Sequence, residues 1–166
     1  MRNKNRFVYG LLLTTTLIYS GASLSAGFVI LRDKNQGICS LPVPAPGTNI
    51  SYSFYPDATS PCKGFNDNAR TIQVAEVPSA TTIKLTNHHW CSSDTEGPWV
   101  HIKTIKKRTS TSIIQITNLF TYHPNQIIEP GLQLIMLLST PDNLDKISCV
   151  RIITSAAPPT SSTTTP

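Results

Sequence analysis

Four cysteines carry the clearest chemistry in this sequence. Their number is even and no two form a Cys-x-x-Cys pair, so disulfides are a better interpretation than a redox motif or a zinc site. Four cysteines allow three pairings, and the sequence alone does not choose between them. We expect one bond between Cys39 and Cys62 and another between Cys91 and Cys149. In the chain-entropy model each bond would stabilise the fold by about 3–4 kcal/mol.

Other residue patterns that could do chemistry argue against an enzyme. The run His88-His89-Trp90-Cys91 suggests a metal site, but adjacent histidines in a strand point to opposite faces and no third ligand accompanies them. The sequence has no GxSxG, no HExxH and no Gly-rich phosphate loop. Asp94 and Glu96 lie in a polar segment that predicts a solvated loop. We therefore predict no catalytic residues.

Aromatic and basic side chains are the remaining candidates for a binding surface. The aromatic candidates are Tyr52, Tyr55, Trp90, Trp99 and Tyr122. They could line a carbohydrate or protein surface, but aromatic residues of a small β-sandwich are more often in the core or on its half-buried flank, which is the interpretation we favour. The basic run is Lys103, Lys106, Lys107 and Arg108. We expect a solvated strand end there, and the alternative is a contact with a polyanion or an anionic lipid surface.

The first 26 residues have the organisation of a secretory signal peptide. A basic start is followed by an apolar run over residues 7–19 and by small residues up to Ala26. The run is shorter than the roughly 20 apolar residues of a membrane span. Three of the fourteen Lys and Arg residues lie in this segment, which leaves eleven against nine Asp and Glu, a net charge of +2. So small a charge does not indicate nucleic-acid binding.

The elements that position these residues read as short strands. Apolar and polar residues alternate in short segments separated by proline and glycine, the pattern of half-buried β-strands. The predicted strands are 28–31, 49–54, 71–74, 81–85, 99–105, 113–117, 132–138 and 146–153. We expect an all-β sandwich of about eight strands over residues 27–154. Residues 155–166 are rich in Ser, Thr and Pro and predict a disordered tail.

Two segments carry a family resemblance. The run Phe65-Asn66-Asp67-Asn68-Ala69-Arg70-Thr71-Ile72 resembles the signature of βγ-crystallin Greek keys: two Asn/Asp residues, two variable residues, then Ser/Thr and Ser. The run Asp145-Lys146-Ile147-Ser148-Cys149-Val150 resembles a second copy, with Leu144 and Cys149 as departures. The resemblance covers roughly residues 28–153. Within it, the stretch 62–85 is similar to small secreted microbial members of the group. The resemblance implies a Greek-key β-sandwich built from two four-stranded halves.

The resemblance also implies a calcium site. Ca²⁺ takes about 6–8 oxygen ligands, and in the family a hydroxyl at the fifth signature position is typically one of them. The first copy has Arg70 at that position, so we expect its site to be lost, whereas the second copy keeps Ser148. The candidate ligands are Asp67, Asn68, Asp145 and Ser148. The alternative, which we favour, is that these side chains only cap turns.

These observations predict a class of function more than a particular ligand. We expect a secreted, extracellular or periplasmic, monomeric module without enzymatic activity, which serves as a scaffold or binds a protein or glycan partner and has at most one weak calcium site. The alternative is a secreted effector, toxin-like or antimicrobial, that acts on other cells through the basic run and the tail. A hydrolase or its inhibitor is a third hypothesis, and it would need a pocket with a histidine next to an acid and a hydroxyl.

Overall fold

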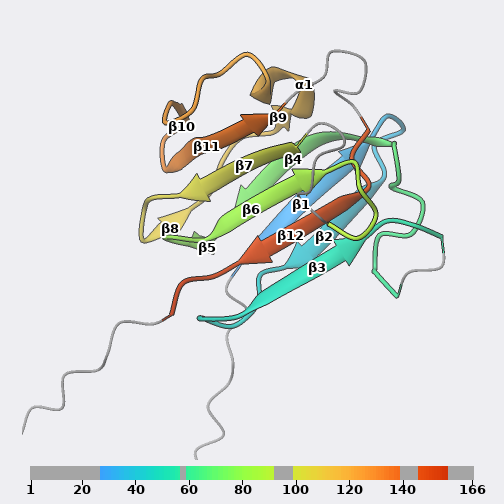
Figure 1. Cartoon of the computed structure of the whole chain (residues 1–166), viewed down its shortest axis with the longest axis horizontal. Coiled ribbons are helices and arrows are strands. Elements are labelled where there is room, and N and C mark those ends of the chain that lie inside the picture. The colour runs from blue at the N-terminus through green and yellow to red at the C-terminus, as the bar shows by residue number, and fades with distance from the viewer. Residues whose placement is uncertain (1–26, 57–58, 92–98, 139–145, 157–166) are drawn as a thin grey trace, which may run out of the picture.

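The computed structural model of the chain describes residues 27–56, 59–91, 99–138 and 146–156. Within them nearly all of the regular secondary structure is β-strand, and the two main antiparallel sheets face each other (Figure 1). The predicted signal peptide, residues 1–26, lies outside the described residues, as do Asp94, Glu96, Asp145 and residues 157–166 of the predicted tail. The structure confirms an all-β fold compatible with a β-sandwich.

The two main sheets have four and six strands. The four-stranded sheet has the order β2-β1-β4-β9, with bounds β2 (Ile38–Pro42), β1 (Phe28–Asp33), β4 (Ala69–Ala75) and β9 (Ile114–Gln115). The six-stranded sheet has the order β10-β11-β7-β6-β12-β3, with bounds β10 (Ile127–Glu129), β11 (Leu132–Leu138), β7 (Trp99–Thr104), β6 (Thr82–Thr86), β12 (Cys149–Ile153) and β3 (Asn49–Ser53). A small ribbon pairs β5 (Val77–Pro78) with β8 (Arg108–Thr109), and the short helix α1 spans Ile116–Leu119.

The two halves of the chain exchange strands between the sheets. In the first half, β4 lies beside β1 and β1 beside β2, while β3 joins the six-stranded sheet. The second half repeats this pattern, since β12 lies beside β6 and β6 beside β7, while β9 joins the four-stranded sheet. The hairpin of β10 and β11 extends the six-stranded sheet beyond β7. Each main sheet therefore contains strands from both halves.

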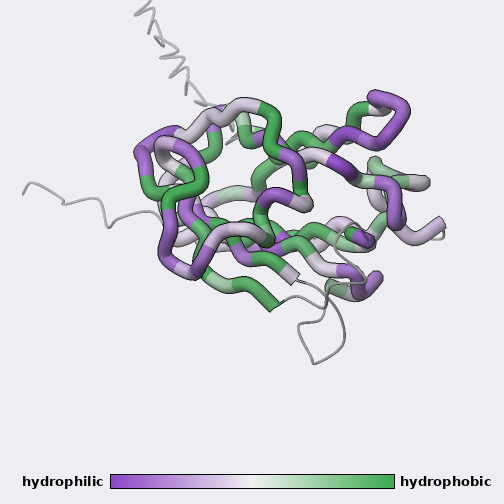
Figure 2. The backbone as a smooth tube through the Cα atoms, turned by 90° about the horizontal axis from the view of Figure 1, so that it is seen from above, coloured by the Kyte–Doolittle hydropathy of each residue, from purple (hydrophilic) through white to green (hydrophobic). Residues whose placement is uncertain are grey.

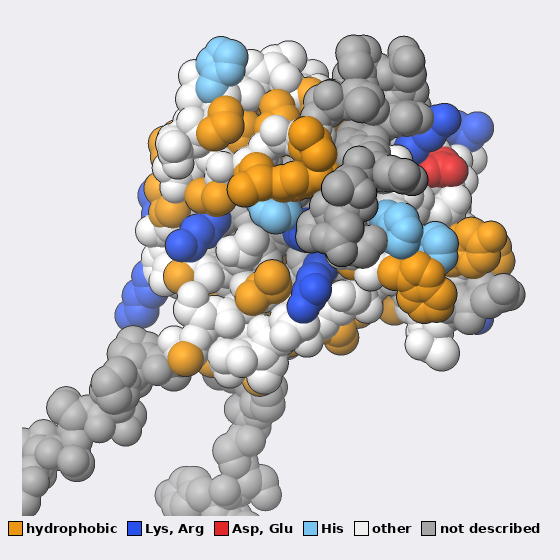
Figure 3. Space-filling model, in the orientation of Figure 1, with side chains coloured by type: hydrophobic (Ala, Val, Ile, Leu, Met, Phe, Trp, Pro, Cys, Tyr) orange, Lys and Arg blue, Asp and Glu red, His pale blue; other side chains and the backbone are white. Residues whose placement is uncertain are grey.

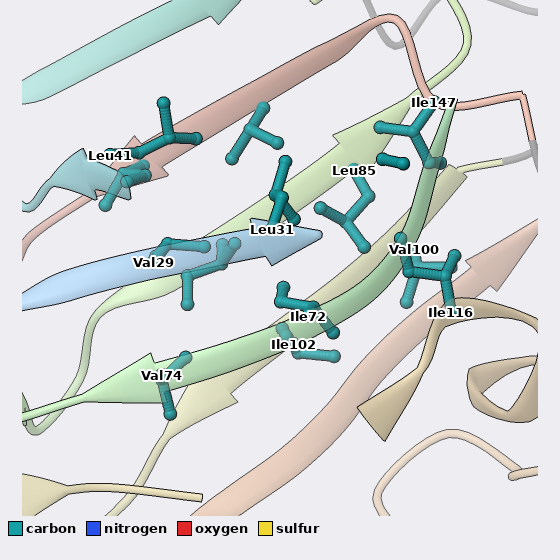
Figure 4. Close-up of a cluster of buried hydrophobic side chains, with 14 of the residues drawn as sticks. Val29, Leu31, Leu41, Ile72, Val74, Leu85, Val100, Ile102, Ile116 and Ile147 are labelled. Atoms are coloured by element: carbon teal, nitrogen blue, oxygen red, sulfur yellow. The ribbon is translucent and has the colours of Figure 1, made fainter. Parts of the chain in front are cut away.

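The core lies between the two sheets and follows the predicted alternation. Its members are fully buried side chains, at 0–1% exposure, that point inward from β1, β4, β6 and β7: Val29, Leu31, Ile72, Val74, Ile83, Leu85, Val100 and Ile102. Side chains from both sheets meet in this layer (Figure 4). Figure 2 shows hydrophobic strand segments (green), with hydrophilic segments (purple) in the turns. Burying each such side chain stabilises the fold by about 1.5–3 kcal/mol.

Two disulfides tie the sheets to their connecting loops. Cys39 of β2 is bonded to Cys62 in the segment that leads to β4, with Cα atoms 5.5 Å apart. Cys91, which follows β6, is bonded to Cys149 of β12, with Cα atoms 5.3 Å apart. This is the predicted pairing. Each bond lies within one half of the chain.

The strand predictions need two corrections. The described residues form twelve strands rather than about eight, because β2, β5, β8 and β10 were not predicted. The strand predicted over 113–117 ends after Gln115, where the chain enters α1. Ile116 and Leu119 are both buried there. Two apolar residues three positions apart share one face of a helical turn. Over so short a segment, the pattern of apolar residues does not distinguish such a turn from a strand.

Candidate functional site

Two exposed aromatic side chains and a histidine between them form one cluster, which we call the aromatic shelf and define as Tyr55, His89 and Trp90. The ring centroids of Tyr55 and His89 are 5.2 Å apart, and those of His89 and Trp90 are 5.0 Å apart. Trp90 is 75% exposed and Tyr55 is 48% exposed. In Figure 3, histidine and hydrophobic side chains gather at the right of the face shown. The prediction of a core or half-buried position is therefore wrong for Trp90.

A tight turn after β6 presents two of the three shelf residues. The Thr86 hydroxyl accepts a hydrogen bond from the His88 backbone N–H at 2.9 Å, and it donates one to the His88 carbonyl oxygen at 3.0 Å. The Cys91 N–H donates to the same carbonyl at 2.9 Å. The backbone φ of Cys91 is +54°, an uncommon value for a residue with a side chain. The disulfide between Cys91 and Cys149 of β12 anchors this turn to the sheet, so the backbone that carries His89 and Trp90 is covalently held.

Tyr55 reaches the shelf because the chain alternates at the end of β3. Phe54 is fully buried and packs edge-on against Phe65, with ring centroids 6.3 Å apart. The next residue, Tyr55, therefore points outward, and its backbone N–H lies 3.4 Å from the Ser53 hydroxyl that accepts it. The buried Phe54 ring and the exposed Tyr55 ring therefore belong to consecutive residues. The packing of Phe54 in the core thus fixes the position of the Tyr55 backbone and the direction of its side chain.

A cavity of about 510 Å³ adjoins the shelf. It is lined by residues 50–53 of β3, by residues 59–61, and by His89, Trp90 and Cys149. Among these described lining residues none is Asp, Glu, Lys or Arg, and several carry hydroxyls. Apolar walls with a few polar groups are typical of ligand sites. The cavity can therefore accommodate an uncharged ligand in contact with the shelf.

The structure brings together two of the four predicted calcium ligands. Ser148 is buried, and its hydroxyl lies 3.3 Å from the Asp67 carboxylate oxygen Oδ1, to which it donates. The Asp67 N–H also donates to the Ile147 carbonyl at 3.1 Å. The Asn68 side chain instead donates to the Gly64 carbonyl at 3.0 Å, which caps its own turn. Asp145 lies outside the described residues.

Arg70 occupies the same turn and works against a cation there. Its guanidinium donates to the carbonyl oxygens of Asp67 and Ala69, each at 3.3 Å. The second carboxylate oxygen of Asp67 accepts a hydrogen bond from the Asn66 side chain at 3.1 Å. Both carboxylate oxygens of Asp67 thus accept hydrogen bonds from protein side chains. The described residues contain no group of three or more His, Cys, Asp or Glu placed to hold a metal ion.

A second polar cluster lies on the six-stranded sheet, on the side away from the core. Lys84 of β6 pairs in register with His101 of β7, and the His101 ring lies 4.6 Å from the Trp99 ring. The Lys84 Nζ atom lies 6.0 Å from the Trp99 ring centroid. Burial, and then the charge of Lys84, lower the pKa of His101 to about 4. The sequence analysis did not identify this cluster.

The other sequence candidates have plain structural roles in the described residues. Tyr52 is buried, its hydroxyl donates to the Pro42 carbonyl at 2.7 Å, and burial raises its pKa. Lys106, Lys107 and Arg108 are exposed at the turn before β8, where the Arg108 guanidinium donates to the Glu76 carbonyl at 3.3 Å. The prediction of a solvated basic run is consistent with these positions.

Comparisons with known proteins add no family assignment. No helix in the described part of the chain has the length and apolar character needed to cross a membrane. The chain has no match among protein-family models, curated proteins or solved structures.

Proposed function

We propose that this chain is a non-enzymatic extracellular binding module whose contact surface is the aromatic shelf together with the adjoining cavity. The observation that carries the proposal is the 75% exposure of Trp90 beside a neutral cavity of about 510 Å³. Tryptophan has a large apolar surface and is enriched among the residues that dominate binding energy. A disulfide fixes the turn that presents it, which lowers the entropy lost on binding.

The chemistry of the cavity supports binding rather than catalysis. A general acid–base mechanism needs a titratable group positioned by a partner. His89 is the one titratable side chain among the described lining residues apart from Tyr52, and no carboxylate lies among them. The hydroxyls of Ser53 and Ser60 are each placed to accept a backbone hydrogen bond, from Tyr55 and Cys62 respectively. The hypothesis of a hydrolase therefore gains no support from this cavity.

The strand arrangement supports the βγ-crystallin-like part of the proposal. A Greek key places its fourth strand beside its first, and β4 beside β1 follows this rule. In the second half β12 lies beside β6, with the two-residue β8 and the β10–β11 hairpin as additions to the four strands β6, β7, β9 and β12. The two signature copies occupy equivalent places, since the first runs into β4 and the second into β12. The two disulfides are typical of proteins in oxidising compartments. We accordingly propose a βγ-crystallin-like extracellular scaffold.

Calcium has a minor role in this proposal. Asp67 and Ser148 offer two oxygen atoms where the resemblance implies the metal, while Arg70 brings positive charge to the same turn. Like charge opposes cation binding. We therefore propose that any calcium affinity is weak and that the shelf binds its ligand without it.

The test uses the oxidised full chain on an array of uncharged oligosaccharides and uncharged peptides. Trp90→Ala should weaken binding of any retained ligand at least tenfold, because truncating such a residue costs about 2 kcal/mol or more. Ile113→Ala is the matched control, since Ile113 is 52% exposed but does not line the cavity. Unchanged binding by Trp90→Ala, or no retained ligand, would refute the proposal.

The effector hypothesis is a second candidate, favoured by the exposure of the basic run. Ile105 is 47% exposed next to Lys106, Lys107 and Arg108. An apolar side chain among basic ones suits the surface of an anionic membrane. Reversing the three charges should abolish binding to vesicles that contain phosphatidylserine. Equal binding by the reversed variant would reject this candidate.

A further inference from the structure

Strand β3 forms one edge of the six-stranded sheet and pairs with β12 on one side only. The Phe54 N–H donates to the Ser148 carbonyl at 2.9 Å, and the Thr154 N–H donates to the Thr48 carbonyl at 3.0 Å. Backbone hydrogen bonds of an antiparallel pair alternate between the two sides of a strand. The even-numbered residues 48–54 therefore direct their backbone groups toward β12. Asn49, Ser51 and Ser53 direct theirs away from the sheet.

This edge lacks the usual protections against an added strand. Natural edges carry charged residues, proline or bulges that prevent further pairing. Residues 49–53 read Asn-Ile-Ser-Tyr-Ser, and their register with β12 has no shift. The other sheet edges differ, since β2 ends in Pro42, β10 has a register shift and β9 has two residues. Among the described edge strands, β3 is the one suited to pairing.

The cavity beside the shelf runs along this same edge. Successive side chains of a strand point to opposite faces, yet the cavity is lined by four consecutive residues, 50–53. Lining by four consecutive residues of an edge strand is consistent with a cavity that reaches the free edge of β3, and Cys149 of the neighbouring β12 lines it as well. Residues 59–61 also line it, as do His89 and Trp90 of the shelf. An extended chain placed against β3 would therefore lie in the cavity and contact the shelf.

We propose that the edge of β3 binds an extended, uncharged polypeptide segment as a seventh strand of the six-stranded sheet, with a side chain of the segment packed on Trp90. The outward groups of Asn49, Ser51 and Ser53 repeat about every 6.8 Å, the two-residue repeat of an extended polypeptide. We take the bound segment to be uncharged because no Asp, Glu, Lys or Arg stands among the described lining residues to pair with a buried charge. This inference rests on the proposed function and names its ligand class.

The test selects binders from a phage library of random nine-residue peptides made of Ser, Thr, Val, Tyr and Gly. Ser51→Pro removes one outward N–H, and proline is tolerated at edge positions whose N–H faces solvent. Peptides selected on the wild-type chain should bind Ser51→Pro at least tenfold more weakly than they bind Ser51→Ala, which loses the same hydroxyl but keeps the backbone N–H. In hydrogen exchange, the amides of Ser51 and Ser53 should be protected by the peptide, while those of Ile50 and Tyr52 change little.

A second measurement needs no altered protein and covers the case in which Ser51→Pro does not fold. The selected peptide is synthesised with N-methyl groups on alternate residues in each of the two possible registers. One register should abolish binding to the wild-type chain, because only one side of an added strand faces β3. Equal weakening by both registers, or by neither, would overturn strand addition.

The remaining outcomes separate this inference from the proposed function. Selected peptides that bind Ser51→Pro as tightly as wild type would overturn strand addition, although loss of their binding in Trp90→Ala would leave the binding module standing. Retention of a neutral oligosaccharide but of no peptide would have the same meaning. Failure to retain either class would overturn both.

Discussion

Acidification should destabilise the fold through His101. Burial and the neighbouring Lys84 lower its pKa in the folded state to about 4, from an ordinary value of 6.5. Above pH 6.5 the imidazole is neutral in both folded and unfolded chains, so it contributes no pH dependence. Between pH 6.5 and pH 4 the unfolded chain binds the proton first, so stability falls as the pH falls. Below about pH 4 both states are protonated and the loss levels off.

The size of the effect follows from the shift. A shift of one pKa unit corresponds to about 1.4 kcal/mol, and solvent screening of this half-buried ring reduces the full value roughly by half. We expect the His101 contribution at pH 4.5 to lower the free energy of unfolding by about 1–2 kcal/mol relative to pH 7. In urea unfolding this amounts to a midpoint lower by about 0.5–1 M.

The assay is urea unfolding of the oxidised chain at pH 7 and pH 4.5, followed by tryptophan fluorescence. His101→Gln should remove most of the loss, and Lys84→Gln should remove a smaller part, because burial is the larger cause. The matched control is His123→Gln, since His123 is exposed and should leave the loss unchanged. The reasoning is refuted if His101→Gln loses as much stability on acidification as wild type.

Three further predictions concern calcium, the core and one disulfide. Millimolar Ca²⁺ should raise the thermal midpoint, relative to EDTA, by more in Arg70→Ser than in the wild-type chain, and adding Asp67→Asn should cancel this gain. Equal rises in Arg70→Ser and wild type would reject a calcium site at this turn. Leu85→Ala should cost about 2–5 kcal/mol in urea unfolding because Leu85 is fully buried, and a cost under 1 kcal/mol would contradict the assigned core. Replacing both Cys39 and Cys62 by Ser should cost about 3 kcal/mol, and an unchanged midpoint would show that the loop constraint contributes nothing.

Alternation was enough to predict the long strands but not the short ones. The strands predicted over 81–85 and 99–105 are present as β6 and β7, and Leu85 and Ile102 are buried there, because half-buried strands repeat every two residues. Strand β2 has the same alternation, with Cys39 and Leu41 buried, but its proline-rich exit reads as a turn. Strands β5 and β8 have two residues each, and pairing between distant segments defines them. Local sequence does not contain that information.

The shelf shows why a site is harder to predict than a fold. The run that contains His89 and Trp90 was visible as unusual, but tryptophan serves cores and surfaces alike. Its exposure follows from a turn closed by Thr86 and from the Cys91 disulfide. The proximity of Asp67 and Ser148, 81 residues apart, agrees with the family resemblance. Whether calcium binds there stays a prediction.

The exchange of β3 and β9 between the sheets makes the two halves of this chain interdependent. Neither half can complete a sheet alone, because each supplies one strand to the other's sheet. Both disulfides lie within a half, so neither of them joins the halves covalently. A peptide-bond cut between β4 and β6 would therefore leave two fragments held together without a covalent bond, by the shared sheets and the core between them. The two halves thus share their sheets rather than packing as separate units. Intact and cut forms should both unfold in a single cooperative step.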